Sequence, residues 1–326
     1  MRKAFFALST LVIAVALVFV PLPLYVISPA PAMPVLDTVR VTGASDALSG
    51  ELLMTTVNVG PATAVRAVGA QFFDPNAELV PLSAIRPAGV NEQEFREAQT
   101  RLFEESVRVA AAVGLRLSGH QVSVSGEGAE VLQVIPGSNA EGLLKSGDVI
   151  VAVNGEPVRL ATDLAVRTAR AAAGEKLRLA VRRDDAELNV DIAVGTIPGS
   201  SQTGLGVSVM TVHERIALPE GVTVDDVSDI GGSSAGLMLA LAVYDLFDPV
   251  DLTRGRRIAG TGTVVLSGAV GPIGGVEEKI HAAELAQATI FLAPAEQAAQ
   301  FRELSPEGIE VVAVTNVQDA IEALRR

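Results

Sequence analysis

The stretch "GGSSAGLMLALAVYDLF", residues 231–247, places two glycines and two serines directly before a strongly apolar run. Glycines suit tight turns and serines suit the position before a helix, so the stretch predicts a turn that leads into a buried helix. In the simplest interpretation the serines only cap that helix. In the alternative, one serine is aimed at a substrate. It then needs a base from elsewhere in the chain, because a serine hydroxyl alone is a poor nucleophile.

The composition excludes several kinds of site. The chain of 326 residues is long enough for two domains, and it has no cysteine, which rules out disulfides and thiolate metal sites. A net charge of -13 argues against a nucleic-acid partner. The sequence contains no His-Glu-x-x-His and no phosphate loop ending in Gly-Lys-Ser/Thr. We therefore expect no metal, no cofactor and no ATP hydrolysis.

The amino terminus has the pattern of a membrane anchor. After Arg2 and Lys3 the next charged residue is Asp37, and the apolar run from residue 4 to residue 26 is long enough to cross a bilayer. We predict one transmembrane helix within residues 1–32, with the amino terminus in the cytoplasm and the rest of the chain outside the cell membrane. The alternative is a cleaved signal peptide that ends near Ala30-Pro31-Ala32.

The middle of the chain contains a predicted helix followed by a small separate module. Residues 91–117 predict a surface helix that turns Phe95, Ala98, Leu102, Val109 and Val113 towards a core. The following residues, 118–196, read as a small β-rich module with one amphipathic helix.

This module resembles a PDZ domain through the run "PGSNAEGLLKSGDVIVAVNG", residues 136–155. The resemblance implies binding of protein or peptide C-termini as an added strand. It also implies a carboxylate-binding loop, which we place at Leu117, Ser118 and Gly119. The alternative is a PDZ fold that only packs against its neighbour.

The last third, residues 200–326, reads as α/β and contains a candidate base. Lys279 follows Gly274-Gly275 at the start of a predicted helix, and burial would lower its pKa towards neutrality. Taken alone, Lys279 is better explained as a surface partner of Glu277 or Glu278. A histidine base is the other alternative, and the chain has three histidines: His120, His213 and His281.

Two separated motifs together resemble the Ser-Lys proteolytic domain of the Lon protease family. They are "GGSSAG" at residues 231–236 and "GGVEEK" at residues 274–279. The resemblance implies that Ser234 is the nucleophile, that Lys279 is its base and that the Thr261 hydroxyl supports the lysine amine. For such a reaction we expect the backbone N–H groups of Ser234 and of the adjoining Gly232–Ser233 turn, at the start of a helix, to stabilise the oxyanion.

The same resemblance extends upstream and predicts the organisation of the chain. We expect an α/β (α+β) proteolytic domain formed by residues 35–117 and 200–326, with the PDZ domain of residues 118–196 inserted into it. A transmembrane helix precedes both. The family also implies a homo-hexamer, although its ATPase part has no counterpart here.

The sequence departs from the family at the acidic residue of the second strand, where Thr56 stands. The expected function is an ATP-independent, membrane-anchored serine endopeptidase. The alternatives are a catalytically degenerate scaffold that binds extracytoplasmic proteins and a Ser-His hydrolase of small esters.

Overall fold

The chain folds into two compact units. The computed structural model describes residues 18, 20–44, 49–87, 89–184, 186–198, 203–226, 230–304, 306 and 308–326. Unit 1 comprises Met1–Val122 and Leu218–Arg326, and unit 2 comprises Ser123–Ala217. These borders differ from the expected ones, because residues 118–122 belong to unit 1 and residues 203–217 belong to unit 2.

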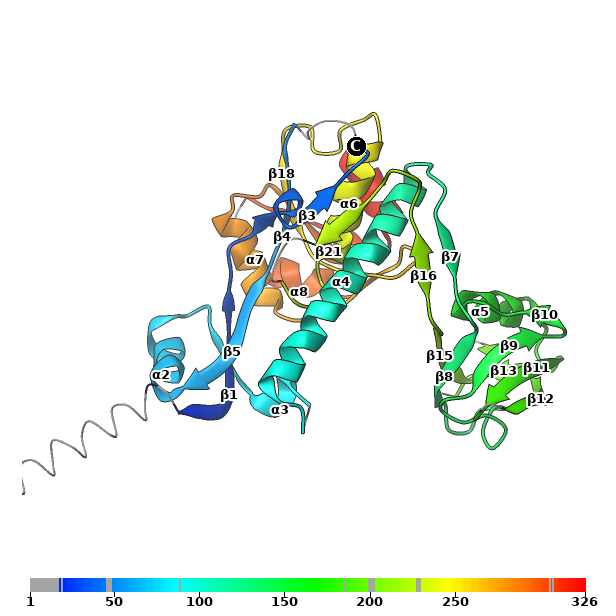
Figure 1. Ribbon diagram of the computed structural model, residues 1–326. Coiled ribbons are helices and arrows are strands. Elements are labelled where there is room, and N and C mark those ends of the chain that lie inside the picture. The colour runs from blue at the N-terminus through cyan, green and yellow to red at the C-terminus, as the bar shows by residue number, and fades with distance from the viewer. Residues whose placement is uncertain are drawn as a thin grey trace, which may run out of the picture. The chain divides into compact units, whose positions relative to one another are not determined.

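The centre of unit 1 is a five-stranded sheet in the order β2-β4-β18-β21-β22. All strands but the short β2 run parallel. The strands are Met33–Pro34 (β2), Glu51–Met54 (β4), Arg257–Gly260 (β18), Ile290–Pro294 (β21) and Glu310–Val314 (β22). Parallel strands require crossover connections, and here helices supply them (Figure 1).

Helices cover both faces of this sheet. Leu53, Ala259 and Phe291 point to one face and form a core with α7 and α8. On the opposite face Gly260 lies against Met238 of α6. The helices of this part of unit 1 are Glu92–Leu117 (α4), Gly236–Phe247 (α6), Val276–Leu285 (α7), Ala298–Glu303 (α8) and Val317–Arg325 (α9). Short elements complete this part: Val35–Asp37 (η1), Val39–Val41 (β3) with Val224–Asp226 (β17), and Thr263–Val264 (β19) with Val270–Gly271 (β20).

The helix α4 begins where the sequence predicts it. Asn91 caps its amino end and forms a capping box with Glu94. The expected buried face is wrong at one position, because Leu102 is 42% exposed while Phe103 is fully buried. Further along, α4 is buried on nearly every side because α6, β17 and β19 surround its second half. A single apolar stripe therefore does not describe it.

The predicted membrane helix is wrong in its last part, because those residues form a strand in a second layer of unit 1. Pro21–Pro29 form strand β1, the middle strand of the sheet β5-β1-β6. Pro21 and Pro23 lack the N–H that a helix needs, and they lie where the pairing of β1 with β5 is irregular. The other elements of this layer are Val57–Thr63 (β5), Ala64–Phe73 (α2), Glu78–Pro81 (β6) and Leu82–Ile85 (α3).

The rest of the predicted anchor, residues 1–17 and 19, lies outside the described residues. Among the residues that are described, no helix is both long enough and apolar enough to cross a membrane.

Unit 2 is a small β-rich domain with its own core. Its sheet has the order β12-β11-β9-β8-β15, with β10 beside β9, and helix α5 is Ala161–Arg170. The strands are Ala129–Val134 (β8), Val149–Val153 (β9), Glu156–Pro157 (β10), Lys176–Arg183 (β11), Ala186–Ala193 (β12) and Val207–Thr211 (β15). Short pairs join Gly195–Thr196 (β13) to Thr203–Gly204 (β14) and Ser123–Ser125 (β7) to Arg215–Ala217 (β16). The strand at residues 207–211, which we expected in the proteolytic domain, therefore belongs to this sheet.

Candidate active site

The Gly-Gly-Ser-Ser stretch forms the predicted turn before α6. Gly232 adopts a φ of 85°, in the left-handed region that favours glycine. The carbonyl of Ser234 accepts from the Gly262 N–H at 2.8 Å and from the Thr261 hydroxyl at 3.0 Å. Ser234 is half-buried and lies two residues before the first residue of α6, so its position is fixed by the loop that follows β18.

Lys279 approaches this serine from a separate helix. Its Nζ lies 2.7 Å from Ser234 Oγ and 3.1 Å from Thr261 Oγ1. Lys279 is in the first turns of α7, and its side chain reaches inward because Gly275, at the cap position, turns the chain into the helix. The structure thus brings together the three residues that the sequence singled out for nucleophile, base and support.

Burial changes the acidity of Lys279. The residue is only 2% exposed, and desolvation lowers the pKa of its amine to about 8. The neighbouring Glu278 opposes this shift, but desolvation is the larger effect. An appreciable share of the amine is therefore neutral near physiological pH, as a proton acceptor requires.

The competing interpretations of this lysine and of the base do not fit the geometry. A surface ion pair with Glu277 or Glu278 is excluded by the burial of Lys279. The three histidines have other partners: His120 contacts Ser118, His213 contacts Glu127, and His281 contacts Asn76 and Glu284. Within the described residues, none of them is hydrogen-bonded to Ser234.

The predicted oxyanion turn needs one correction. The N–H of Gly232 donates to the carbonyl of Gln99 at 2.8 Å and is already used. Ser233 serves as a turn residue, because its carbonyl accepts from the Gly236 N–H at 3.3 Å. No described residue accepts from the Ser234 N–H, which leaves this donor at the amino end of α6 for a substrate oxygen.

Sequence reasoning missed the role of α4 in holding this turn. Besides the Gln99 carbonyl, the buried Ser106 hydroxyl donates to the Ser233 carbonyl at 3.3 Å. Neither residue belongs to a motif. Their position in a helix with one buried side was the only available signal.

A cleft of about 1290 Å³ opens onto Ser234 and Lys279 within unit 1. One wall is formed by β1 and β5, including Tyr25 and Val57–Pro61, and another by the amino-terminal half of α4. Within the described residues, β5 is an edge strand of its sheet. An extended peptide can therefore lie along the cleft beside β5.

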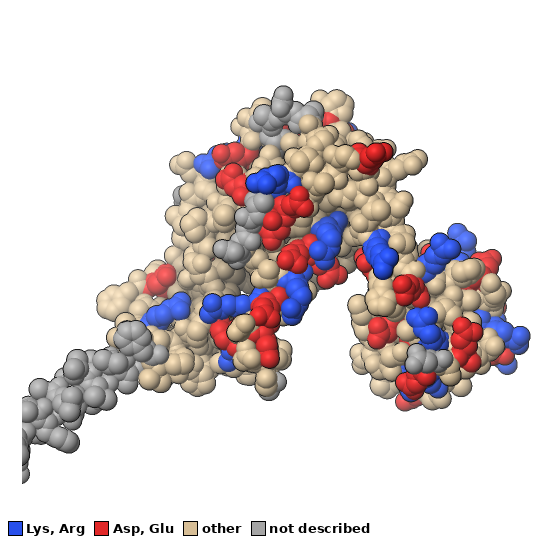
Figure 2. All heavy atoms as spheres, viewed as in Figure 1, with Lys and Arg blue, Asp and Glu red and all other residues tan. Residues whose placement is uncertain are grey.

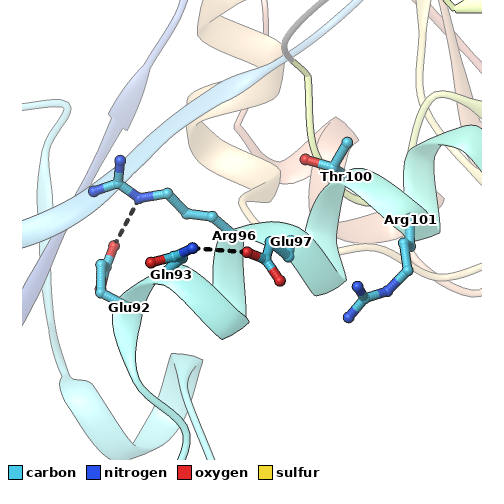
Figure 3. A pocket seen from close by; sticks show the side chains of 6 residues that line it. All are labelled: Glu92, Gln93, Arg96, Glu97, Thr100 and Arg101. Atoms are coloured by element: carbon cyan, nitrogen blue, oxygen red, sulfur yellow. Dashed lines mark hydrogen bonds and ion pairs between the residues drawn. The ribbon is translucent and has the colours of Figure 1, made fainter.

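Polar side chains of α4 line a second pocket, which shares Glu92, Arg96 and Thr100 with this cleft (Figure 3). Arg96 contacts Glu92 at 3.3 Å, and Gln93 donates to Glu97 at 3.0 Å. Glu92 also accepts from the buried Tyr25 hydroxyl and from Arg86. This network ties α4 to β1, and it contains no nucleophile and base at hydrogen-bonding distance. The chemistry is therefore expected at Ser234.

The predicted carboxylate loop of the small domain is wrong. Leu117 ends α4, Ser118 is its C-cap, and Gly119 has a φ of 89°, so all three terminate a helix of unit 1. In unit 2, β15 is one of the edge strands of the sheet, and it lies beside α5. The segment Gly204–Val207, which reads Gly-Leu-Gly-Val, leads into this strand. It was missed because the loop was expected before the module and not after it.

Two protein-family models match the chain. The PDZ domain model matches residues 113–194. The model of the Lon protease (S16) C-terminal proteolytic domain matches residues 184–325, which include Ser234, Thr261 and Lys279.

Curated relatives match in short segments. The mitochondrial Lon protease homolog of Rattus norvegicus is 37% identical over 116 residues, which are 34% of this chain and 11% of that protein. The Lon protease of Phenylobacterium zucineum is 34% identical over 38% of this chain and 16% of its own length. A probable periplasmic serine endoprotease DegP-like of Pseudomonas putida is 31% identical over 34% of this chain and 27% of its own length. The chain thus spans between about a tenth and about a quarter of these relatives.

Proposed function

We propose that this chain, which carries a PDZ domain and a Lon-type C-terminal proteolytic domain, is a membrane-anchored serine endopeptidase that works without ATP. The observation that carries the proposal is the distance of 2.7 Å between Lys279 Nζ and Ser234 Oγ, at a lysine that is 2% exposed. A surface lysine would stay protonated and could not take up the serine proton.

In the proposed reaction the neutral Lys279 amine accepts the proton of Ser234 Oγ while that oxygen bonds to the scissile carbonyl carbon. The ammonium then donates this proton to the departing amine as the carbon–nitrogen bond breaks. Water, deprotonated by the same lysine, then attacks the acyl carbon. The carbon–Oγ bond breaks, and the ammonium returns its proton to Ser234 Oγ. The Ser234 N–H stabilises the oxyanion, and loss of one such donor typically costs about 3 kcal/mol of transition-state stabilisation.

Labelling by a fluorophosphonate tests the nucleophile. The unmodified chain and the matched control Ser233→Ala should be labelled at Ser234, as seen by peptide mass spectrometry. The variants Ser234→Ala and Lys279→Met should not be labelled, and they should lose cleavage of an unfolded protein such as casein with and without ATP. Absence of labelling across neutral and alkaline pH would favour the alternative, a degenerate scaffold.

For unit 2 we propose capture of peptide C-termini along β15. Support comes from its position as a sheet edge beside α5 and from the Gly206 φ of 82°, which lets the preceding loop turn back sharply. Peptides with a free carboxylate should bind in a fluorescence anisotropy titration, and the same peptides with a C-terminal amide should bind at least tenfold more weakly. Equal binding would show that no carboxylate is recognised.

The anchor and the assembly also remain proposals. Residues 4–20, "AFFALSTLVIAVALVFV", still meet the lower end of the roughly 17–25 apolar residues that a membrane helix needs. We place the remainder of the chain outside the cytoplasm. A hexameric ring is the expected assembly, and sedimentation of the detergent-solubilised chain tests it.

A further inference from the structure

Helix α2 places its larger apolar side chains on the outside. Val65, Val68, Phe72 and Phe73 are 53%, 51%, 74% and 82% exposed. Its inward side consists of small residues, Ala67 and Ala70, which pack on the β5-β1-β6 sheet. An exposed patch of large apolar side chains normally marks a surface that contacts another protein or a membrane. Within the described residues, nothing covers the outward face of α2.

The chain itself places this face next to the proposed anchor. Pro21, the first residue of β1, pairs with Thr63, the N-cap of α2. The apolar residues 4–20 therefore join the fold beside the amino end of α2. Val18 and Val20 are also exposed, at 46% and 55%. Because α2 has ten residues, its whole outward face lies within about 15 Å of that junction.

We propose that α2 lies in the membrane interface, with Val65, Val68, Phe72 and Phe73 inserted among the lipids beside the anchor. This inference rests on the membrane anchorage proposed above. Interfacial helices bury their apolar face about 5–10 Å into the boundary between headgroups and acyl chains. The opposite side of α2 does not need to enter the lipid, because its alanines are packed on protein.

The charges around α2 favour uncharged lipid. Arg66 is the only cationic residue of α2, and its guanidinium donates to the Pro61 carbonyl. Asp74 follows the helix directly. Figure 2 shows few charged side chains at this end of unit 1 on the face in view. The attraction is therefore hydrophobic, so phosphatidylcholine should suffice and salt should have little effect.

The absence of tryptophan from the chain allows a direct test. Phe73→Trp introduces a single indole on the outward face of α2, and Val68→Trp introduces one a turn and a half earlier. The matched control is Val250→Trp, because Val250 is 48% exposed and lies three residues beyond the far end of α6. Each full-length variant is reconstituted into phosphatidylcholine vesicles and checked by circular dichroism.

In vesicles, Phe73→Trp and Val68→Trp should emit at shorter wavelength than the control. Lipids brominated near the headgroup should quench both more strongly than lipids brominated deep in the chain, and acrylamide should quench them less. Quenching by acrylamide equal to that of Val250→Trp would overturn the proposal. Protection from acrylamide without quenching by brominated lipid would also overturn it, because a second protein copy would then cover α2.

Failure of the anchor is recognised separately. If the unmodified chain does not float with the vesicles, both the anchor and the α2 proposal are wrong. The fluorophosphonate reaction of Ser234 still decides the peptidase proposal in that case.

Discussion

The neighbours of Lys279 determine how its amine can be used. The Thr261 hydroxyl donates its one proton to the Ser234 carbonyl at 3.0 Å, so it faces Lys279 as an acceptor. Lys279 must therefore donate an N–H to Thr261. In the neutral amine, the remaining lone pair is then free to point at Ser234 Oγ, 2.7 Å away. Thr261 in this way orients the base.

Peptide cleavage should depend on the protonation of Lys279. Desolvation lowers the pKa of this amine to about 8, and only the neutral form can accept the Ser234 proton. We expect kcat/KM for casein-derived peptides to rise as the pH increases through about 8 and to level off above it. A rate that stays constant from pH 6 to 9 would contradict Lys279 as the base.

The burial of Lys279 should also lower the free energy of unfolding whenever its amine is charged. Between pH 8 and 10.5 the unfolded chain binds the proton and the folded chain does not, so stability rises with pH across this window. Below pH 8 the charged form is buried at a cost of about 3 kcal/mol. Lys279→Met should therefore raise the free energy of unfolding at pH 7 by about 1–3 kcal/mol, after the loss of its hydrogen bonds. The gain should shrink above pH 8.

Urea unfolding followed by tyrosine fluorescence measures this effect in unit 1. Both tyrosines of the chain, Tyr25 and Tyr244, lie in that unit, and there is no tryptophan. The exposed Lys176 of unit 2 provides the control, because Lys176→Met should leave the transition unchanged. If Lys279→Met is less stable than the unmodified chain at pH 7, burial of the charged amine does not lower the stability of the fold.

The sequence singled out Ser234, Thr261 and Lys279 as a candidate site because their local motifs are distinctive. It could not establish that Lys279 is buried, because the covering residues come from distant segments. Val57 lies beside Gly275, and Thr261 belongs to the loop after β18. The hydrogen bond from the Gly232 N–H to the Gln99 carbonyl could not be predicted either, because it depends on where α4 passes the turn.

At the scale of elements, apolarity alone misled the assignment of β1. Residues 21–26 continue the charge-free amino terminus, yet Tyr25, Val26 and Ile27 are buried in a sheet. A short apolar run such as residues 21–26 is compatible with either the end of an apolar helix or a buried central strand. The two prolines were the better guide, because they end the helical part of the pattern. The capped start of α4, by contrast, was predictable from Asn91 and Glu94 alone.

The contact between α4 and α6 depends on one glycine. A Cβ added at Gly114 would lie 2.5 Å from the Ala240 carbonyl oxygen and 2.9 Å from the Tyr244 nitrogen. Gly114→Ala should therefore separate the helices and lower the free energy of unfolding by about 1–3 kcal/mol. Since α4 also holds the nucleophile turn through Gln99 and Ser106, kcat should fall as well.

A helical glycine with free space provides the comparison for Gly114. A Cβ at Gly69 of α2 would meet nothing within 4 Å. Gly69→Ala should raise stability by about 0.5–1 kcal/mol, because alanine loses less backbone entropy in a helix. The two variants are compared by the tyrosine-detected urea transition. Equal effects would mean that the close approach at Gly114 is not what holds α4 against α6.

At the scale of the whole molecule, the core clusters of the described residues each belong to one unit. The core of unit 2 runs from Ala129 to Leu205, while the clusters of unit 1 use residues before 123 and after 217. The sequence did not indicate the second border between the units, which lies after Ala217. The strand β15 follows a polar linker, yet it pairs with β8 from the start of the module.

The paired strands β7 and β16 suggest how unit 2 can be removed. Ser125 pairs with Arg215, so the two connections between the units lie side by side. Replacing residues 126–214 by a short glycine-containing turn should leave the tyrosine-detected transition of unit 1 and the cleavage of short peptides unchanged. Cleavage of long chains that carry a recognised C-terminus should fall at least tenfold in kcat/KM, through KM rather than kcat, because capture is lost while the Ser234–Lys279 geometry is kept. An equal loss for short peptides would mean that unit 2 supports the active site itself.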